Sequence, residues 1–301
     1  ITVPLPVIVR GENGRWHLFS SSRVAHGQSY EGFYIAQGGD YDGKIVERNA
    51  AGEEVRPIDL SLTKTAFALL FNSALLMLIV LGAARWYKRH PVRTSAPGGF
   101  VGLMEAAVMM IHDDLIKSCV GKDYKRFAPY LLTVFFFILI NNLMGLVPIF
   151  PGGANVTGNI AITLLLAIAT FIMTNVFGTR EYWKEIFWPE VPTWLKCPVP
   201  MMPAIEFVGI LTKPFALMIR LFANMMAGHA VILSLTCLVF VTVSMGPVVN
   251  GSMTVVIFCI FMNLLELLVA FIQAYVFTML SAVFIGLARV EPHHKKEEQE
   301  I

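Results

Sequence analysis

Five long runs of apolar residues follow one another from residue 67 onward, and they constrain the fold more than any other feature. They lie near residues 67–84, 129–147, 160–177, 203–245 and 253–288. Crossing a bilayer takes a helix of about 20 apolar residues, so each run predicts a transmembrane helix. The last two runs are longer than an upright crossing requires, because 43 residues at about 1.5 Å each reach roughly 64 Å against a core of about 30 Å. We expect these two helices to be tilted, broken or extended beyond the bilayer.

The composition is that of a membrane protein. Of the 301 residues, 56% are hydrophobic and only 15% are charged, which is too apolar for a soluble domain. A net charge of +2 gives no general attraction to nucleic acid. The four cysteines show no C-x-x-C spacing, so we expect neither a disulfide framework nor a metal site, and we expect no cofactor.

Residues 1–61 differ from the rest because they are polar and rich in turns. Two strand-like runs flank Gly11-Glu12-Asn13-Gly14, which predicts a β-hairpin. Pro4 and Pro6 favour an edge position for the first strand. We therefore expect a small β-rich extramembrane segment over residues 1–61 and a membrane domain over residues 62–301.

Residues 100–120 form a helical pattern of a different kind. Apolar residues recur at steps of three and four, while the charged residues fall mostly on the other side of the helix. This amphipathic pattern predicts a helix that lies on the membrane surface. The expected fold is thus an all-α polytopic membrane protein with five transmembrane helices and one amphipathic interfacial helix.

The loops predict the orientation in the membrane. Residues 85–93, 179–202 and the C-terminal tail carry lysine and arginine, whereas loops 148–159 and 246–252 carry no charge. Basic loops stay in the cytoplasm. We expect the N-terminal segment outside, in the periplasm of a bacterium, and the C-terminus in the cytoplasm.

Ionisable residues inside the fourth apolar run indicate a functional site. A charge at the centre of a membrane helix costs about 2.5–3.5 kcal/mol on insertion scales, so such residues are functional candidates. Glu206, Lys213 and Arg220 are each seven residues apart, which places them on one stripe of a helix. Asn224 stays near this stripe, whereas His229 falls on roughly the opposite face.

The fifth run carries Glu266 and Gln273, seven residues apart on one face. In an antiparallel pair of helices, residues at equal depth have a constant sum of residue numbers. The sums for Arg220 with Gln273 (493) and His229 with Glu266 (495) nearly agree. The register therefore predicts that Arg220 faces Gln273, and that His229 meets Glu266 about 13 Å nearer the outside.

This arrangement is typical of an interrupted proton path. His229 and Glu266 can exchange protons near neutral pH and would form the outer half. Glu206 would help to form the inner half, with Arg220 as a fixed positive charge between them. Three alternative interpretations remain. Arg220 forms a structural ion pair, Glu206 is a charge at the membrane interface, and Lys213 only snorkels or positions lipid.

Three stretches resemble subunit a of the F-type ATP synthase: "IRLFANMMAGH", "LLELLVAFIQAYVF" and "LLTVFFFILINNLMGLVP". The resemblance covers about residues 100–289. It implies that Arg220 faces the carboxylate of the rotor. It also implies that His229, Glu266, Asn224 and Gln273 lie along the outer half-channel and the central region, and that Glu206 belongs to the inner half-channel.

The resemblance further implies partners and a location. The partners are the c-ring of the rotor, b-type subunits of the peripheral stalk, the remaining ATP synthase subunits and the lipid bilayer. The order of His229 and Glu266 is that of mitochondrial members, but the long N-terminal segment fits a bacterial branch. We therefore expect the bacterial inner membrane rather than the mitochondrial one.

No ATP chemistry is expected of this chain itself. It has no G-x-x-x-x-G-K-[ST] motif, and the resemblance assigns ATP catalysis to a separate head. Two other classes remain as alternatives: an autonomous ion-coupled secondary transporter, which usually shows internal repeats, and a membrane-anchored binding module that acts through residues 1–60. The sequence leaves the choice between H⁺ and Na⁺ open.

Overall fold

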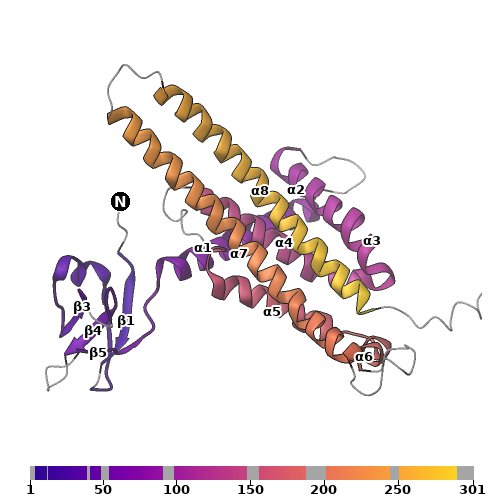
Figure 1. The fold of residues 1–301 in the computed structure, drawn as a ribbon, viewed down its shortest axis with the longest axis horizontal. Coiled ribbons are helices and arrows are strands. Elements are labelled where there is room, and N and C mark those ends of the chain that lie inside the picture. The colour runs from indigo at the N-terminus through magenta and orange to yellow at the C-terminus, as the bar shows by residue number, and fades with distance from the viewer. Residues whose placement is uncertain are drawn as a thin grey trace, which may run out of the picture. The chain divides into compact units, whose positions relative to one another are not determined.

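The computed structural model describes residues 4–11, 13–38, 41–48, 54–90, 98–147, 156–187, 201–244 and 251–289. The chain forms two compact units. One consists of Ile1–Phe71 with Val147–Ala154, and the other of Asn72–Leu146 with Asn155–Ile301. Figure 1 shows the strands of the first unit and the helices of the second.

The first unit contains two small antiparallel sheets. One has the strand order β2-β1-β6 and the other β3-β4-β5. A shared core of Val7, Val9, Phe19, Val24 and Phe33 joins them. The strands are β1 (Pro6–Arg10), β2 (Trp16–Ser20), β3 (Phe33–Ile35), β4 (Ile45–Arg48), β5 (Glu54–Val55) and β6 (Ile58–Asp59), with 3-10 turns η1 (Ser21–Arg23) and η2 (Ala25–Gly27). The expected β-rich N-terminal segment is confirmed.

The predicted hairpin joins β1 to β2. The amide of Gly14 donates to the carbonyl of Gly11 over 3.0 Å, and Gly14 has a φ of 75°, which favours glycine. The expected edge position of the first strand is wrong, because β1 lies between β2 and β6. Pro6 is tolerated there since it is the first residue of the strand, and its carbonyl still accepts a bond from the Leu62 amide.

Helices make up the remainder of the described chain. Helix α1 (Lys64–Arg89) begins in the first unit and continues into the second. The second unit then contains α2 (Gly99–Met109), the π-helical turn η3 (Met110–Ile116), α3 (Lys117–Val120), η4 (Gly121–Asp123), α4 (Tyr124–Leu146), α5 (Ile160–Val176), α6 (Arg180–Phe187), α7 (Met201–Ser244) and α8 (Gly251–Leu287).

Four helical stretches within the described residues are long and apolar enough to cross a membrane: Lys64–Arg89, Gly99–Leu146, Ile205–Leu238 and Val256–Leu287. The sequence predicted five spans, and the difference is α5. That helix is apolar but has 17 residues, or about 26 Å at 1.5 Å per residue, against a hydrocarbon core of about 30 Å. The chain is therefore a multi-pass membrane protein, and a crossing by α5 stays a prediction.

The amphipathic segment near residues 100–120 packs its apolar stripe inward. Ile111 and Leu115 are buried in the core of the second unit, while Asp113 and Asp114 are exposed. The segment is not one regular α-helix, because η3 has the wider π-helical turn. Its expected position on the membrane surface stays a prediction.

Helix α8 crosses the centre of the second unit and packs against α3, α4 and α7. Gly286 permits its close approach to α3. A Cβ at this position would lie 2.1 Å from the carbonyl oxygen of Cys119, which is too short for a contact between non-bonded carbon and oxygen atoms. Phe277 and Ile285 of α8 join Phe127 of α4 in the buried core.

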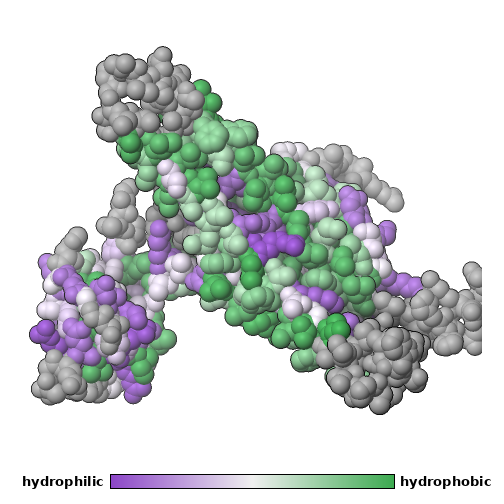
Figure 2. All heavy atoms as spheres, in the orientation of Figure 1, coloured by the Kyte–Doolittle hydropathy of each residue, from purple (hydrophilic) through white to green (hydrophobic). Residues whose placement is uncertain are grey.

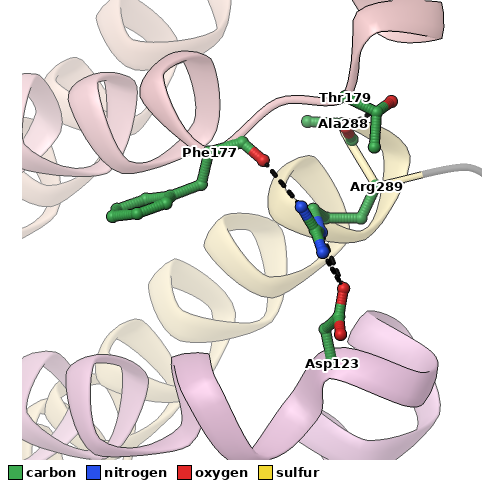
Figure 3. Close-up of polar contacts among 5 residues, drawn as sticks. All are labelled: Asp123, Phe177, Thr179, Ala288 and Arg289. Carbon is green, nitrogen blue, oxygen red and sulfur yellow. Dashed lines mark hydrogen bonds and ion pairs between the residues drawn. The ribbon is translucent and has the colours of Figure 1, made fainter.

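The end of α8 is held by the group of polar contacts in Figure 3. Arg289 donates from Nε to Asp123 Oδ2 over 2.8 Å, and from Nη1 to the carbonyl of Phe177 over 3.2 Å. The Thr179 amide donates to the Ala288 carbonyl over 2.9 Å. We call this set the Arg289 clasp, and it joins η4 and the end of α5 to the end of α8.

Part of the predicted orientation cannot be followed in the structure. Arg93, Lys196, Lys295 and Lys296, which contribute to the basic loops and tail, lie outside the described residues. The placement of the N-terminus outside and the C-terminus inside therefore stays a prediction.

Candidate functional site

The predicted site residues lie on α7 and α8, two long helices that pack side by side (Figure 1). The surface of this pair is largely hydrophobic. Figure 2 shows that hydrophilic side chains interrupt it where α7 passes α8. A polar patch in the middle of two apolar helices is the first sign of a functional site within the membrane.

His229 and Glu266 form one polar contact between these two helices. His229 Nδ1 lies 3.1 Å from Glu266 Oε1, as the predicted register requires. The Glu266 side chain is only 8% exposed, and its other oxygen, Oε2, has no hydrogen-bond partner among the described residues. The second oxygen of this buried carboxyl group is therefore available to accept or release a proton.

Glycine 228 makes room for this carboxyl group. A Cβ at Gly228 would lie 2.7 Å from Glu266 Oε1, so no larger residue fits here without displacing the side chain. A cavity of about 300 Å³ adjoins the pair and is lined by Gly228, Asn224, Met262 and Glu266, among others. Water reaching this cavity would come into direct contact with the carboxyl group.

Gln273 lies further along α8 and binds Asn224. The Asn224 Nδ2 donates to Gln273 Oε1 over 2.6 Å, and Gln273 is 3% exposed. The numbers of this pair sum to 497, close to the 495 of His229 with Glu266, so the antiparallel register holds. The sequence predicted that Arg220 faces Gln273, but in the structure Asn224 contacts Gln273 instead.

Arg220 is exposed on α7. Its neighbours Leu217 and Leu221 are buried at 2% and 0% exposure, whereas Arg220 itself is exposed. Within the part of the chain that the structure describes, its guanidinium forms no hydrogen bond or ion pair. The Glu266 carboxyl group contacts His229, and no ion pair between Arg220 and Glu266 is present among the described residues. Among the described residues, the Arg220 guanidinium is therefore exposed and has no polar partner.

A second polar region lies on the other side of Arg220. A cavity of about 20 Å³, enough for one water molecule, is lined by Thr174 and Asn175 of α5, Tyr182 of α6 and Lys213 of α7, together with apolar side chains. Pro214 also borders this cavity. Because proline has no N–H, the helix lacks one backbone hydrogen bond at this point.

Glu206 is exposed and lies near this second region. Burial raises the pKa of the Tyr182 phenol above its usual value, and the negative charge of Glu206 raises it further. The Tyr182 hydroxyl lies 3.5 Å from Asn175 Oδ1. A carboxylate, a neutral phenol and an amide thus follow one another towards the cavity beside Lys213.

Comparison with known proteins covers most of the chain. Residues 69–286 match the model of the family described as "ATP synthase A chain". Residues 1–61 match a family described as "Domain of unknown function (DUF8433)". The chain belongs to the ATP synthase A chain family.

Bacterial relatives agree with this assignment. The ATP synthase subunit a of Chloroherpeton thalassium is 44% identical over 252 residues, which cover 81% of this chain and 71% of the relative. That of Chlorobium phaeobacteroides (strain DSM 266) is 43% identical over 269 residues, 85% of this chain and 75% of the relative. That of Myxococcus xanthus is 42% identical over 244 residues, which cover 79% of this chain and 76% of the relative. The ATP synthase A chain match spans all six predicted site residues, from Glu206 to Gln273.

Some polar residues of this site were not singled out from the sequence. Thr174 and Asn175 are polar residues inside an apolar run, and Tyr182 follows that run. Their position in or next to an apolar run is the sequence signal that could have identified them. Asn141 and Asn142 of α4 form hydrogen bonds to other helices. Asn141 Oδ1 accepts from Asn72 over 3.0 Å, and Asn142 Nδ2 donates to the Ala270 carbonyl over 3.2 Å.

Proposed function

We propose that this chain is the proton-translocating stator subunit of the F-type ATP synthase, in which two offset half-channels serve a carboxylate of the rotor. The observation that carries the proposal is the separation of polar groups along α7. Arg220, which has no polar partner in the part of the chain that the structure describes, stands between the contact of His229 with Glu266 and the cavity beside Lys213. Nine residues separate Arg220 from His229, and seven separate it from Lys213, which correspond to about 13 Å and 10 Å.

The outer half-channel delivers protons through His229 and Glu266. An imidazole can accept a proton at one ring nitrogen and donate one from the other, so it can pass a proton to a neighbouring carboxylate. The 3.1 Å contact supports this exchange, and the free Oε2 of Glu266 supplies the next acceptor. The adjoining cavity of about 300 Å³ supports access by water. Asn224 and Gln273 continue the polar surface toward the middle of α7.

Arg220 separates the two halves. A guanidinium keeps its charge at every physiological pH, so it cannot relay protons as an acid and base. Its exposed position supports contact with a carboxylate on a neighbouring subunit. As a protonated rotor carboxyl group approaches Arg220, the positive charge stabilises the carboxylate form, so the carboxyl group releases its proton into the inner half-channel. The carboxylate then passes Arg220 and takes up another proton on the other side.

The inner half-channel releases protons to the cytoplasm. The cavity beside Lys213, the Tyr182 hydroxyl and the Glu206 carboxylate form its lining in this proposal. Lys213 limits the approach of other cations, while Glu206 attracts protons at the surface. The two half-channels are thus offset along α7 and do not join.

The proposed setting is the inner membrane of a bacterium, with the N-terminus in the periplasm and the C-terminus in the cytoplasm. The rotor c-ring would lie against the Arg220 side of α7, and b-type subunits of the peripheral stalk would bind elsewhere on the chain. ATP is made and hydrolysed by a separate head, which this chain serves as part of the membrane stator.

The test is an Arg220→Ala variant in the complete ATP synthase, reconstituted in proteoliposomes. We expect ATP-driven quenching of a pH-sensitive dye to disappear, while the detached head still hydrolyses ATP. Arg180→Ala, which removes an exposed arginine from α6, is the matched control and should pump normally. Normal pumping by Arg220→Ala would refute the role of this charge.

Two further measurements distinguish a stator subunit from an autonomous transporter and identify the coupling ion. The purified chain alone in liposomes should not carry out coupled transport, whereas an autonomous secondary transporter should. Pumping by the complete enzyme should persist without sodium. Dependence on sodium would replace protons by Na⁺ as the coupling ion.

A further inference from the structure

One face of the sheet β2-β1-β6 is apolar and exposed. Side chains alternate along its strands, so Val7, Val9 and Phe19 point into the core. Trp16 and Leu18 of β2 point outward and are 55% and 73% exposed. The outward face of a soluble sheet is usually polar, so this one requires an explanation.

The neighbouring strands extend the same face. Leu18 pairs with Ile8 of β1, and the Leu60 amide donates to the Ile8 carbonyl over 2.9 Å. Ile58 of β6 pairs with Arg10 of β1. Ile58 and Leu60 are 59% and 62% exposed. These residues together with Trp16 form one continuous surface, which we call the outer sheet face.

Arg10 supplies a positive charge to this face. It pairs with Trp16 across the sheet, and its guanidinium lies 5.9 Å from the centre of the indole ring. Its Nε donates to the carbonyl of Gly14 over 3.1 Å. The face therefore combines an aromatic ring, branched aliphatic side chains and one cation.

The sheet leads into α1 almost without a linker. The Leu62 amide is still hydrogen-bonded to the Pro6 carbonyl, and α1 begins at Lys64. Thr63 alone lies between them, and its hydroxyl accepts a bond from the Ala66 amide over 3.2 Å. Sheet and helix start belong to the same compact unit. The position of the sheet is therefore tied to the end of α1.

This connection keeps the outer sheet face close to the membrane. Helix α1 is long and apolar enough to cross a bilayer. Leu60, which belongs to the face, precedes Lys64 by four residues, and four residues span at most about 14 Å. The headgroup layer on each side of the hydrocarbon core is several ångströms thick, so the face lies within reach of it.

We propose that the outer sheet face binds the lipid headgroup layer of the membrane that α1 crosses. Tryptophan is enriched at membrane interfaces because one part of its ring is apolar and the other is polar. Leu18, Ile58 and Leu60 would insert among the outer parts of the acyl chains. Arg10 would bind lipid phosphate, which favours anionic lipids. The N-terminal unit would thus act as a surface anchor for α1.

The test measures the surroundings of Leu18 in the complete complex. Leu18→Cys is introduced into a variant in which the four native cysteines are replaced by serine, and is labelled with an environment-sensitive fluorophore. Lys44→Cys, at an exposed position next to β4, is the matched control. Proteoliposomes of phosphatidylcholine and phosphatidylglycerol carry nitroxide quenchers near the lipid headgroup. We expect quenching at least twofold stronger at position 18 than at position 44.

Ile58→Cys provides a second position on the same face, and should be quenched as Leu18→Cys is. Arg10→Glu should weaken the quenching at position 18 in vesicles that contain phosphatidylglycerol, but not in pure phosphatidylcholine. Equal quenching at positions 18 and 44 would refute the proposal. Protection of position 18 from both the lipid quencher and soluble iodide would also refute it, because a protein partner would then cover the face.

Discussion

Gly228→Ala should disturb proton uptake without removing any titratable group. An alanine Cβ would lie 2.7 Å from Glu266 Oε1, whereas ordinary contacts begin near 3.4 Å. The carboxyl group must therefore move by about 0.7 Å, the difference between these two distances. A shift of this size away from His229 would lengthen the contact with Nδ1 from 3.1 Å to about 3.8 Å, which is beyond hydrogen-bond range.

The size of the effect follows from the lost contact. A hydrogen bond to a charged group contributes about 1.5–3 kcal/mol, and each 1.4 kcal/mol corresponds to a factor of ten in rate. We expect ATP synthesis driven by an imposed pH gradient to fall about 10- to 100-fold in proteoliposomes that contain the complete enzyme. Raising the external proton concentration should restore part of the rate, because the change affects uptake from the outside.

Gly209→Ala is the matched control. Gly209 lies on the same helix, and a Cβ there would meet no atom within 4 Å. Both changes raise helix propensity by about the same amount, up to 1 kcal/mol, so a general effect on α7 would appear in both variants. Equal activity of the two variants would show that the position of the Glu266 carboxyl group is not important for transport.

Three further predictions concern the pair and the packing of α8. His229→Leu and Glu266→Leu should each slow proton uptake. Exchanging the two residues should slow it less, because both titratable groups stay at one depth; slower uptake in the exchanged variant than in either leucine variant would contradict this. Asp123→Asn removes the ion pair with Arg289 and should lower the free energy of unfolding, but only by about 1 kcal/mol because the pair is partly exposed. Arg289→Gln should add little to this loss when the two changes are combined, and thermal unfolding in detergent measures both variants. Gly286→Ala should destabilise the chain by about 1–3 kcal/mol in the same assay, since the new methyl group meets the backbone of α3, and an unchanged melting temperature would show that the two helices separate easily.

The register of α7 and α8 could be predicted because it depends on residue spacing alone. Two antiparallel helices with the same rise per residue keep a constant sum of residue numbers, which placed His229 opposite Glu266. The partner of Gln273 could not be fixed to better than one helical turn. Arg220 and Asn224 are four residues apart on one side of α7, and the choice between them depends on rotamers and on packing of Leu217 and Leu221.

The inner region was harder to predict because its parts come from separate elements. Lys213 and Glu206 stood out as charges in an apolar run, but Asn175 and Tyr182 lie on α5 and α6. Sequence spacing relates residues on one helix and says little about how three helices meet. The edge position of β1 was wrong for a similar reason, since β6, which covers it, comes about 50 residues later in the chain.

The Arg289 clasp gives α8 a fixed end, and this has a mechanical consequence. Gln273 lies sixteen residues before Arg289, so a sideways force at its depth acts on a lever arm of about 24 Å. The resulting bending moment is resisted where the guanidinium holds both Asp123 and the backbone of Phe177. The guanidinium is planar and bonded to two separate groups, so these bonds oppose rotation of the side chain as well as its displacement. The single ammonium group of a lysine would leave the side chain free to rotate. In the proposed function, drag from the rotor would load this corner of the helical unit, and its stiffness would set how far α8 bends before the rotor advances.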